Sequence, residues 1–527
     1  MVIYIRILIL TGEQSFPILK KTIEQIKKHI IDLHRVPVSI SAFIKENMVK
    51  KVVENIDIDN YDLVLLPGFI QWDSANLEKK FGLKIRKGPE FASDLPWVMD
   101  NLDINQLSTK FPADKYLQKT GRNKYEEIVQ KNLISAKQSI DHSNFFINEN
   151  KSNIMIGRNL PPPIIAEIVN CTLKSDQKIL RKVKHYLNSG ADVIDIGCVS
   201  NNPKPHRVAE IIDLIQNRYD CLISIDSMNK NEILTAIEHQ IDIILSLDIG
   251  NFEDFLNIPK DIPIVILPTN INKGFFPKNP EQRVENLFNL TKILMDKGFT
   301  KIIADPLLET PISPGILNSL QAYYLYYLKS SQKKYNHLKL PMFFGVSNVV
   351  ELMDIDSIGI NGLLASFAIE LDIGILFTVE HSTKMMNGVR ELKEAVKLNY
   401  LSKNNKTPPI NQGIQYFKAK GKTSQDKPDI MEKNILKVEE PIETYIPDDK
   451  GYFKIYVSHY QKEICVLFYS NDNLHKKTVI GSEAEAISKK IMELNLTNNI
   501  YHINYLGREL KKAEICLDSG KPYIQDE

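Results

Sequence analysis

Acidic and amide side chains recur in this sequence at the ends of short apolar runs. Asn170 ends such a run in VNCT, Asp195 lies in DVIDIG, and Asp226 lies in SIDS. Asp305 closes another run in ADP, and Asn348 follows a further run in FFGVSN. Carboxylates can act as general acids and bases, or they can accept hydrogen bonds from an N–H-rich heterocycle. A ring N–H beside an exocyclic amine matches the two oxygens of a carboxylate.

A regular alternation of strands and helices between residues 161 and 402 explains how these side chains would meet. Helical patterns fill most of the intervals between eight apolar runs, although the short helix expected at about 252–256 is the weakest repeat. Such a series predicts a (β/α)₈ TIM barrel, whose chemistry gathers at the carboxyl ends of its strands. The predicted strands are 164–170, 192–197, 221–226, 241–247, 263–268, 301–305, 341–345 and 373–378.

Each acid also has an ordinary structural explanation. Asp195 or Asp226 could cap the helix that follows it, or pair with a lysine of the barrel. Capping does not require several acids to converge at one end of the barrel. The group as a whole therefore favours a ligand site at the barrel mouth, where the eighth strand adds Thr378, Glu380 and His381.

The N-terminal residues 1–120 predict a small Rossmann-like α/β domain. Amphipathic stretches alternate there with β-branched runs, which is typical of a parallel sheet covered by helices. The loops LPGFIQWDS and KIRKGPEFASDLP follow its third strand, and we interpret them as ordinary connections. The predicted strands are 3–10, 36–43 and 61–67, and the predicted helices are 17–31 and 45–56.

Three further segments complete the predicted organisation. Residues 121–160 form a helical connector to the barrel. Residues 403–448 are polar and carry scattered prolines, which predicts an irregular linker. Residues 449–527 begin with alternating strands and continue with helical patterns, which predicts a small α+β domain of unknown role.

Charge and cysteine content argue against several classes of partner. The 66 basic and 65 acidic residues give a formal net charge of +1, which favours neither nucleic acid nor an anionic membrane. Five scattered cysteines predict no disulfide framework and no structural zinc site, and they suit a cytoplasmic protein. We interpret Cys171 and Cys198 as packing residues. No apolar run reaches the roughly 18 residues of a membrane span.

The motifs VNCT, DVIDIGCVS, ISIDS and IIADP, in this order, resemble the pterin-binding domain that dihydropteroate synthases share with methyltetrahydrofolate corrinoid methyltransferases. The whole layout also resembles the archaeal dihydropteroate synthase-related proteins. These proteins join an N-terminal domain, a pterin-binding barrel and a small C-terminal domain. The N-terminal YDLVLLPGFIQWD and the C-terminal YLGRELKKAEICL fit that layout.

The resemblance implies a role for each matched residue. Asn170 lies where the pyrophosphate and Mg²⁺ of the pterin substrate bind in the synthases. Asp226 corresponds to the aspartate that binds the pterin ring, and Asp305 to the one that holds its amino-pyrimidine edge. Asp195 matches the family acid at the end of the second strand, and Ser246 replaces a family asparagine. Thr172 and His381 would contact phosphate or substrate.

Departures from the synthase pattern leave the activity open. The lysine of a Ser-Arg-Lys motif is missing from VSN, and the arginine of an Arg-Val-His ending is missing from TVEHS, where His381 remains. Both cations would normally assist a pyrophosphate leaving group. The segment FFGVSN is instead similar to the methyltransferases, whose matching asparagine, here Asn348, lies near the pterin N5.

Three hypotheses follow for the function. The first is an enzyme of folate or tetrahydromethanopterin biosynthesis, which joins a 6-hydroxymethyl-dihydropterin diphosphate to an aminobenzoate-type amine with Mg²⁺. The second is a methyl-tetrahydropterin-binding protein or methyltransferase with a separate corrinoid partner. The third is a non-catalytic pterin-binding scaffold. A homodimer is compatible with each of them.

Overall fold

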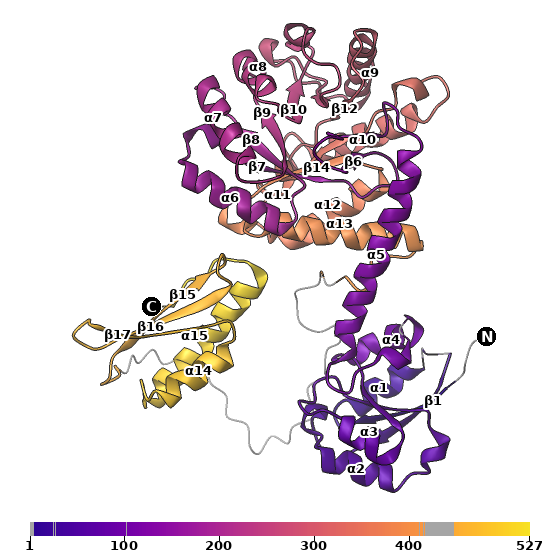
Figure 1. Cartoon of the computed structure of the whole chain (residues 1–527), viewed down its shortest axis with the longest axis vertical. Coiled ribbons are helices and arrows are strands. Elements are labelled where there is room, and N and C mark those ends of the chain that lie inside the picture. Colours follow the sequence, from indigo (N-terminus) through magenta and orange to yellow (C-terminus); the bar gives the residue numbers. More distant parts are fainter. Residues whose placement is uncertain are drawn as a thin grey trace. The chain divides into compact units, whose positions relative to one another are not determined.

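The computed structural model describes residues 5–24, 26, 28–101, 103–410, 412–414, 416 and 447–526 (Figure 1). The predicted linker 403–448 therefore lies mostly outside the described residues. The chain divides into two compact units, of which the first contains Met1–Ile128 and the second contains Val129–Tyr400 and the C-terminal residues.

The second unit contains the predicted barrel. Eight parallel strands follow one another in the order β12-β11-β10-β9-β8-β7-β14-β13. A parallel bridge between Ala304 and Met342 joins β12 to β13 and closes the ring. The strands are β7 (Ile164–Ile168), β8 (Val193–Gly197), β9 (Leu222–Asp226), β10 (Ile243–Leu247), β11 (Ile264–Ile266), β12 (Ile302–Ala304), β13 (Phe343–Gly345) and β14 (Ile375–Val379).

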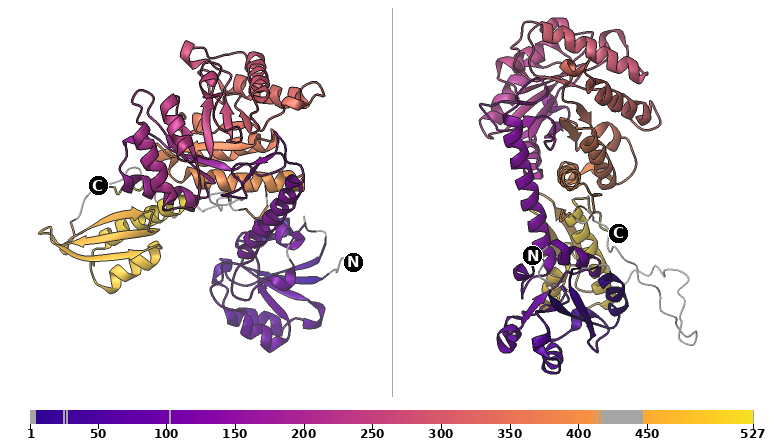
Figure 2. Two further views of the ribbon diagram at one scale, coloured as in Figure 1. Left: turned by 45° about the horizontal axis from the view of Figure 1, so that its top comes forward. Right: turned by 90° about the vertical axis from the view of Figure 1, so that its right-hand side faces the viewer.

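Helices surround the ring of strands (Figure 2). The fourth connection is reduced to a single 3-10 turn, η6 (Phe252–Phe255), as the weak repeat in the sequence predicts. The architecture is a TIM barrel, and that prediction is confirmed. The covering helices are α6 (Asp176–Ser189), α7 (Pro205–Gln216), α8 (Lys230–Glu238), α9 (Pro280–Asp296), α10 (Ile316–Ser330), α11 (Ser347–Val350), α12 (Ser357–Glu370) and α13 (Gly388–Asn405).

Alternation along the strands fills the barrel interior. Successive side chains of a strand point to opposite faces, so every second residue enters the lumen. Ile165, Val193 and Leu222 belong to one buried apolar cluster inside the ring. Phe145 and Ile156 of a short hairpin, β5 (Phe145–Phe146) and β6 (Met155–Ile156), join the same cluster. Because these residues pack against the amino-terminal part of the strands, the hairpin plugs that end and leaves the carboxyl end for ligands.

The first unit is the expected α/β domain. Its parallel strands have the order β2-β1-β3-β4, and the alternation of β1 and β3 builds an apolar core on each face of the sheet. The long helix α5 (Ala113–Lys137) follows the domain. The strands are β1 (Arg6–Thr11), β2 (Ile30–Arg35), β3 (Leu63–Leu66) and β4 (Lys84–Lys87), and the helices are α1 (Phe16–Ile23), α2 (Glu46–Glu54), α3 (Ala75–Phe81) and α4 (Leu95–Asn101).

The predicted strand at 36–43 is wrong. The strand that pairs with β1 is β2, which lies earlier in the sequence, and the preceding helix ends at Ile23. Pro37 carries no N–H for a ladder of hydrogen bonds, so the VPVS segment does not extend the sheet. Residues Ser41–Phe43 instead form a 3-10 turn, η1.

The C-terminal residues form the predicted α+β fold. An antiparallel sheet in the order β15-β16-β17 packs against two helices around one apolar cluster. No helix among the described residues is long and apolar enough to cross a membrane. The strands are β15 (Tyr452–Ser458), β16 (Glu463–Tyr469) and β17 (His475–Gly481), and the helices are α14 (Ala484–Glu493) and α15 (Ile500–Ser519).

We expect Ile165→Ala to destabilise the barrel by about 2–5 kcal/mol, because it leaves a cavity in the buried lumen. Hydrogen exchange of peptides from β7 and β8 would report the loss as faster opening. Ile293→Ala on α9 is the matched control, since this side chain is 41% exposed and its truncation should change stability little. Equal exchange in the two variants would contradict the proposed packing of the lumen.

Candidate functional site

Three carboxylates meet inside the barrel above the apolar cluster. The parallel register places Glu167 beside Asp195, and Gly197 beside Asp226. Glu167 and Asp195 lie two residues after the inward-facing Ile165 and Val193, so they point into the same lumen. Carboxylate oxygens of Glu167, Asp195 and Asp226 lie within 4.8 Å of one another.

Gly197 makes this meeting possible. A Cβ atom at Gly197 would lie 2.2 Å from Oε1 of Glu167 and 3.0 Å from its carboxyl carbon. The carboxylate of Glu167 therefore occupies the space that any other residue at this position would fill. The glycine of DVIDIG thus serves close packing against an acid of the neighbouring strand.

Burial raises the pKa values of all three acids, and neighbouring charges add to the shifts of Glu167 and Asp195. Burial is the largest cause in each case: it raises the pKa of Asp226 to about 6 and, together with the charge of Asp226, that of Glu167 to about 8. Burial and both neighbouring acids also raise the pKa of Asp195 well above its usual range, although a hydrogen bond from Ser224 opposes the shift. Like charges this close, with little water, cannot all be ionised at once.

Asp195 keeps one oxygen without a partner. The side chain is fully buried, and its Oδ1 accepts a 2.6 Å hydrogen bond from the Ser224 hydroxyl. Its Oδ2 has no hydrogen-bond partner among the described residues. A buried carboxylate oxygen of this kind requires a proton, a cation or a ligand donor.

Asp305 lies at the same end of the barrel, directly after β12. Its Oδ1 accepts hydrogen bonds of 2.8 Å from the Tyr323 hydroxyl and from the Leu307 backbone N–H. Burial raises the pKa of Asp305 to about 6, although both hydrogen bonds and the charge of Arg283 act in the opposite direction. Because β9 and β12 are parallel strands of one barrel, Asp226 and Asp305 face the same mouth.

A buried arginine holds the loop that follows Asp305. Arg283 on α9 is 1% exposed and donates to the carbonyl oxygens of Pro306 and Leu307. Its guanidinium also forms an ion pair with Glu309 at 2.5 Å. The arginine is therefore a structural residue that fixes the rim beside Asp305.

The polar residues after the first and fourth strands also lie at this end of the barrel. Asn170 is exposed and has left-handed backbone angles, with φ 50° and ψ 41°. Thr172 is buried, and its hydroxyl has no partner among the described residues. Ser246 lies buried in β10, one residue before its end.

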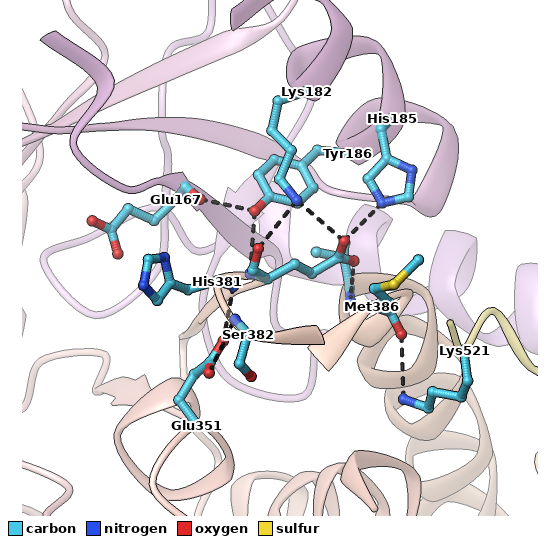
Figure 3. A network of polar contacts seen from close by, with 11 residues as sticks. Glu167, Lys182, His185, Tyr186, Glu351, His381, Ser382, Met386 and Lys521 are labelled. Carbon is cyan, nitrogen blue, oxygen red and sulfur yellow. Dashed lines mark hydrogen bonds and ion pairs between the residues drawn. The ribbon is translucent and has the colours of Figure 1, made fainter. Parts of the chain in front are cut away.

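The last two predicted residues lie beyond β13 and β14. Asn348 is exposed, and its amide N–H donates 2.9 Å to the carbonyl oxygen of Leu308. The amide covers Gly345, where an added Cβ would lie 3.1 Å from Nδ2. His381 is also exposed, and its backbone N–H donates 2.8 Å to Glu351, which fixes the loop after β14 (Figure 3).

Glu380 is engaged in a network behind the mouth. Its carboxylate forms a 2.7 Å hydrogen bond with the His185 ring and lies 3.4 Å from the Lys182 ammonium (Figure 3). Burial raises the pKa of Glu380, but the hydrogen bond and charge of His185 and the charge of Lys182 outweigh it and lower the pKa overall. The Tyr186 hydroxyl accepts from the Glu380 N–H and donates 2.9 Å to the carbonyl oxygen of Glu167. The network therefore positions the backbone of Glu167.

Sequence reasoning missed Glu167 as a member of the site. A charged residue in the apolar strand IIAEI is the signal that could have found it, since alternation places it in the lumen with Ile165.

The two cysteines at the mouth agree with the prediction of packing residues. Burial raises the pKa of Cys171 to about 12 and also raises that of Cys198, which keeps both as neutral thiols.

Comparison with known proteins agrees with this arrangement. The family described as "Pterin binding enzyme" matches residues 168–359, and the family PterinBD-DUF4346 matches residues 447–526. An uncharacterized protein of Methanocaldococcus jannaschii is 33% identical over 533 residues, which cover 99% of this chain and 98% of the relative. The chain belongs to the dihydropteroate synthase-related pterin-binding family.

The family is also similar to dihydropteroate synthases themselves. The dihydropteroate synthase of Haemophilus influenzae is 39% identical over 59 residues, which are 10% of this chain and 22% of that enzyme. The Yersinia pestis dihydropteroate synthase structure is 16% identical, covers 50% of this chain and 99% of its own, and has a TM-score of 0.37. The Coxiella burnetii dihydropteroate synthase in complex with pteroic acid is 16% identical, and the match covers 46% of this chain and 94% of that chain, with a TM-score of 0.36.

The raised pKa of Glu167 predicts a pH dependence of barrel stability. An acid with a higher pKa in the folded chain binds more protons there than in the unfolded chain. Its contribution is therefore complete below its unfolded pKa of about 4.5 and is lost as the pH rises through about 8. We expect the melting temperature of the wild type to decrease relative to that of Glu167→Gln as the pH rises from about 4.5 to about 8, as measured by scanning calorimetry. Glu285→Gln on α9 is the control, since it makes the same change at an exposed position, and parallel profiles for Glu167→Gln and the wild type would contradict the assignment.

Proposed function

We propose that the mouth of the barrel binds a reduced pterin. The observation that carries this proposal is the convergence of Glu167, Asp195, Asp226 and Asp305, four carboxyl groups with raised pKa values, at one end of the strands. A pterin carries several N–H donors along one edge, and these donors would satisfy the carboxyl oxygens that lack partners. The family assignment supports a pterin over other N–H-rich heterocycles.

Each side chain takes a distinct position in this proposal. Asp305 holds the amino-pyrimidine edge, because its Oδ1 is already fixed by Tyr323 and its other oxygen remains for the ligand. Asp226 binds the ring from the opposite side of the mouth, and Asp195 lies beneath it. Ser246 supplies a short hydroxyl contact where the family has an asparagine.

The reaction we propose is the condensation of a 6-hydroxymethyl-dihydropterin diphosphate with an aminobenzoate-type amine, in folate or tetrahydromethanopterin biosynthesis. Asn170, Thr172 and His381 would lie on the diphosphate side. The amide oxygen of Asn170 accepts no hydrogen bond from any described residue and suits Mg²⁺, which prefers oxygen ligands. When bound there, the ion would supply charge that the missing lysine and arginine do not.

A second candidate is supported by the conformation of Asn348. Its Nδ2 donates a hydrogen bond to the Leu308 carbonyl oxygen. Its Oδ1 can therefore accept a hydrogen bond from a protonated ring nitrogen. This geometry suits a protonated N5 of a reduced or methylated pterin. In this alternative the chain binds or transfers a methyl group of a methyl-tetrahydropterin, and a separate corrinoid protein accepts it.

We expect Asp226→Ala and Asp305→Ala each to weaken the binding of reduced pterins by about 1–3 kcal/mol, or about 5- to 150-fold, because a charged hydrogen-bond acceptor is lost. Calorimetry of the full chain with dihydropterin and tetrahydropterin would measure the change. Asp213→Ala on α7 provides a matched loss of one carboxylate far from the mouth. Unchanged affinity in both mouth variants would contradict pterin binding at this site.

Diphosphate release distinguishes the candidate activities. With the pterin diphosphate, the amine and Mg²⁺, the wild type should release diphosphate, and Asp305→Ala should lower the rate at least about tenfold as substrate orientation is lost. No release, together with tighter binding of the methylated pterin that Asn348→Ala abolishes, would favour the second candidate. Binding of pterins without preference or turnover would identify a non-catalytic scaffold.

A further inference from the structure

The N-terminal domain contains a cavity at a point where ligands commonly bind. The strands have the order β2-β1-β3-β4 and are all parallel. From β1 the chain continues to β2 on one side and then crosses to β3 on the other side of β1, so the order of connection reverses between β1 and β3. In open parallel sheets, ligands bind in the crevice at the carboxyl ends of the strands, at this point of reversal. A cavity of about 280 Å³ lies there, lined by Leu10 and Thr11 of β1, by Leu66 at the end of β3 and by Pro67 directly after it.

Aromatic and hydroxyl groups line the walls of this cavity. Phe69 and Phe91 face each other edge to face, with ring centroids 5.6 Å apart, and are 43% and 47% exposed. The hydroxyl of Ser41 accepts from the Gly12 N–H at 2.9 Å and donates to Ser15 at 3.0 Å. The Ser15 hydroxyl donates to no described residue, so its proton is available to a ligand acceptor.

The charge of the lining selects against phosphate. Of the described residues that line the cavity, only Glu90 is charged. The turn after β1 reads TGEQS and lacks the glycine-rich pattern with which Rossmann domains bind pyrophosphate. A dinucleotide would therefore meet the Glu90 carboxylate and no cation among the described lining residues, although Lys115 acts on Glu90 from outside the lining. An N–H-bearing ring without phosphate is the complementary ligand.

Glu90 is held in place by its backbone, and its carboxylate remains free. Its N–H donates 2.6 Å to Asp114, and a Cβ at Gly68 would lie 2.6 Å from its backbone nitrogen. The loops after β3 and β4 therefore touch directly at Gly68. No described residue donates a hydrogen bond to the Glu90 carboxylate. Burial and the charge of Asp114 raise the pKa of Glu90, although the charge of Lys115 acts in the opposite direction.

We infer that this cavity is a second binding site, for a flat nitrogen heterocycle that carries two adjacent N–H donors and no phosphate. The ring lies against Phe69 and Phe91, its paired N–H groups donate to the two oxygens of Glu90, and a ring carbonyl accepts from Ser15. This inference goes beyond the pterin site of the barrel and does not depend on it.

Guanosine and inosine test the inference, because they differ only in the exocyclic amine that completes the pair of donors. Calorimetry of the full chain should show one guanosine site with at least tenfold lower affinity for inosine. Glu90→Gln keeps the size of the side chain and should weaken guanosine at least tenfold, with little effect on inosine. Ala42→Phe fills the cavity and should abolish binding of both, while the circular dichroism spectrum and melting temperature show that the variant is folded.

Two control variants make the result decisive. Asp59→Asn removes an exposed carboxylate at the amino-terminal edge of the same sheet and should leave guanosine affinity unchanged. Asp305→Ala should also leave it unchanged, since that residue belongs to the barrel. Absence of guanosine binding, equal affinity for inosine, loss of binding in Asp305→Ala, or preference for ADP-ribose would each overturn the inference.

Discussion

The barrel site depends on the electrostatic cost of holding several carboxyl groups together away from water. Glu167, Asp195 and Asp226 come from three adjacent strands, and their oxygens lie within 4.8 Å of one another. Burial favours the protonated form of each acid, and repulsion from neighbouring carboxylates adds to this effect for Glu167 and Asp195. A ligand rich in N–H donors would satisfy these carboxyl oxygens, which is the physical basis of the proposed pterin site.

The surrounding structure keeps these acids from moving apart. Gly197 gives the carboxylate of Glu167 its place, and Tyr186 fixes the backbone of Glu167 through a hydroxyl that also contacts the Glu380 backbone. The hairpin of β5 and β6 fills the opposite end of the lumen with apolar side chains. A rigid frame is needed because relaxation of the acids toward solvent would lose the preorganisation on which selectivity depends.

The periodicity of the sequence was sufficient to predict the barrel and the acidic residues at its mouth. All eight strands were predictable, because each is a short buried run, and the acidic residues in or directly after three of these runs identified Asp195, Asp226 and Asp305. Alternation within IIAEI places Glu167 in the lumen, but its position beside Asp195 follows from the strand register, which the sequence does not give. The error at β2 has a similar origin: IIDLHR and VPVSI are both plausible strands, and pairing with β1 decides between them.

The closure of the ring has a consequence for how the wall of the mouth is held together. Among the described residues, β12 and β13 are joined through one bridge, in which the Ala304 N–H donates to Pro341. The neighbouring strand pairs have longer ladders, so backbone hydrogen bonds contribute least to the wall at this seam. Asp305 and Asn348 flank the seam, whereas the acid triad lies across the ring from it. The Tyr323 hydroxyl lies 2.8 Å from both Asp305 Oδ1 and the Phe343 carbonyl oxygen, and the Asn348 amide donates to Leu308, so side chains take the place of a backbone ladder where the ring closes.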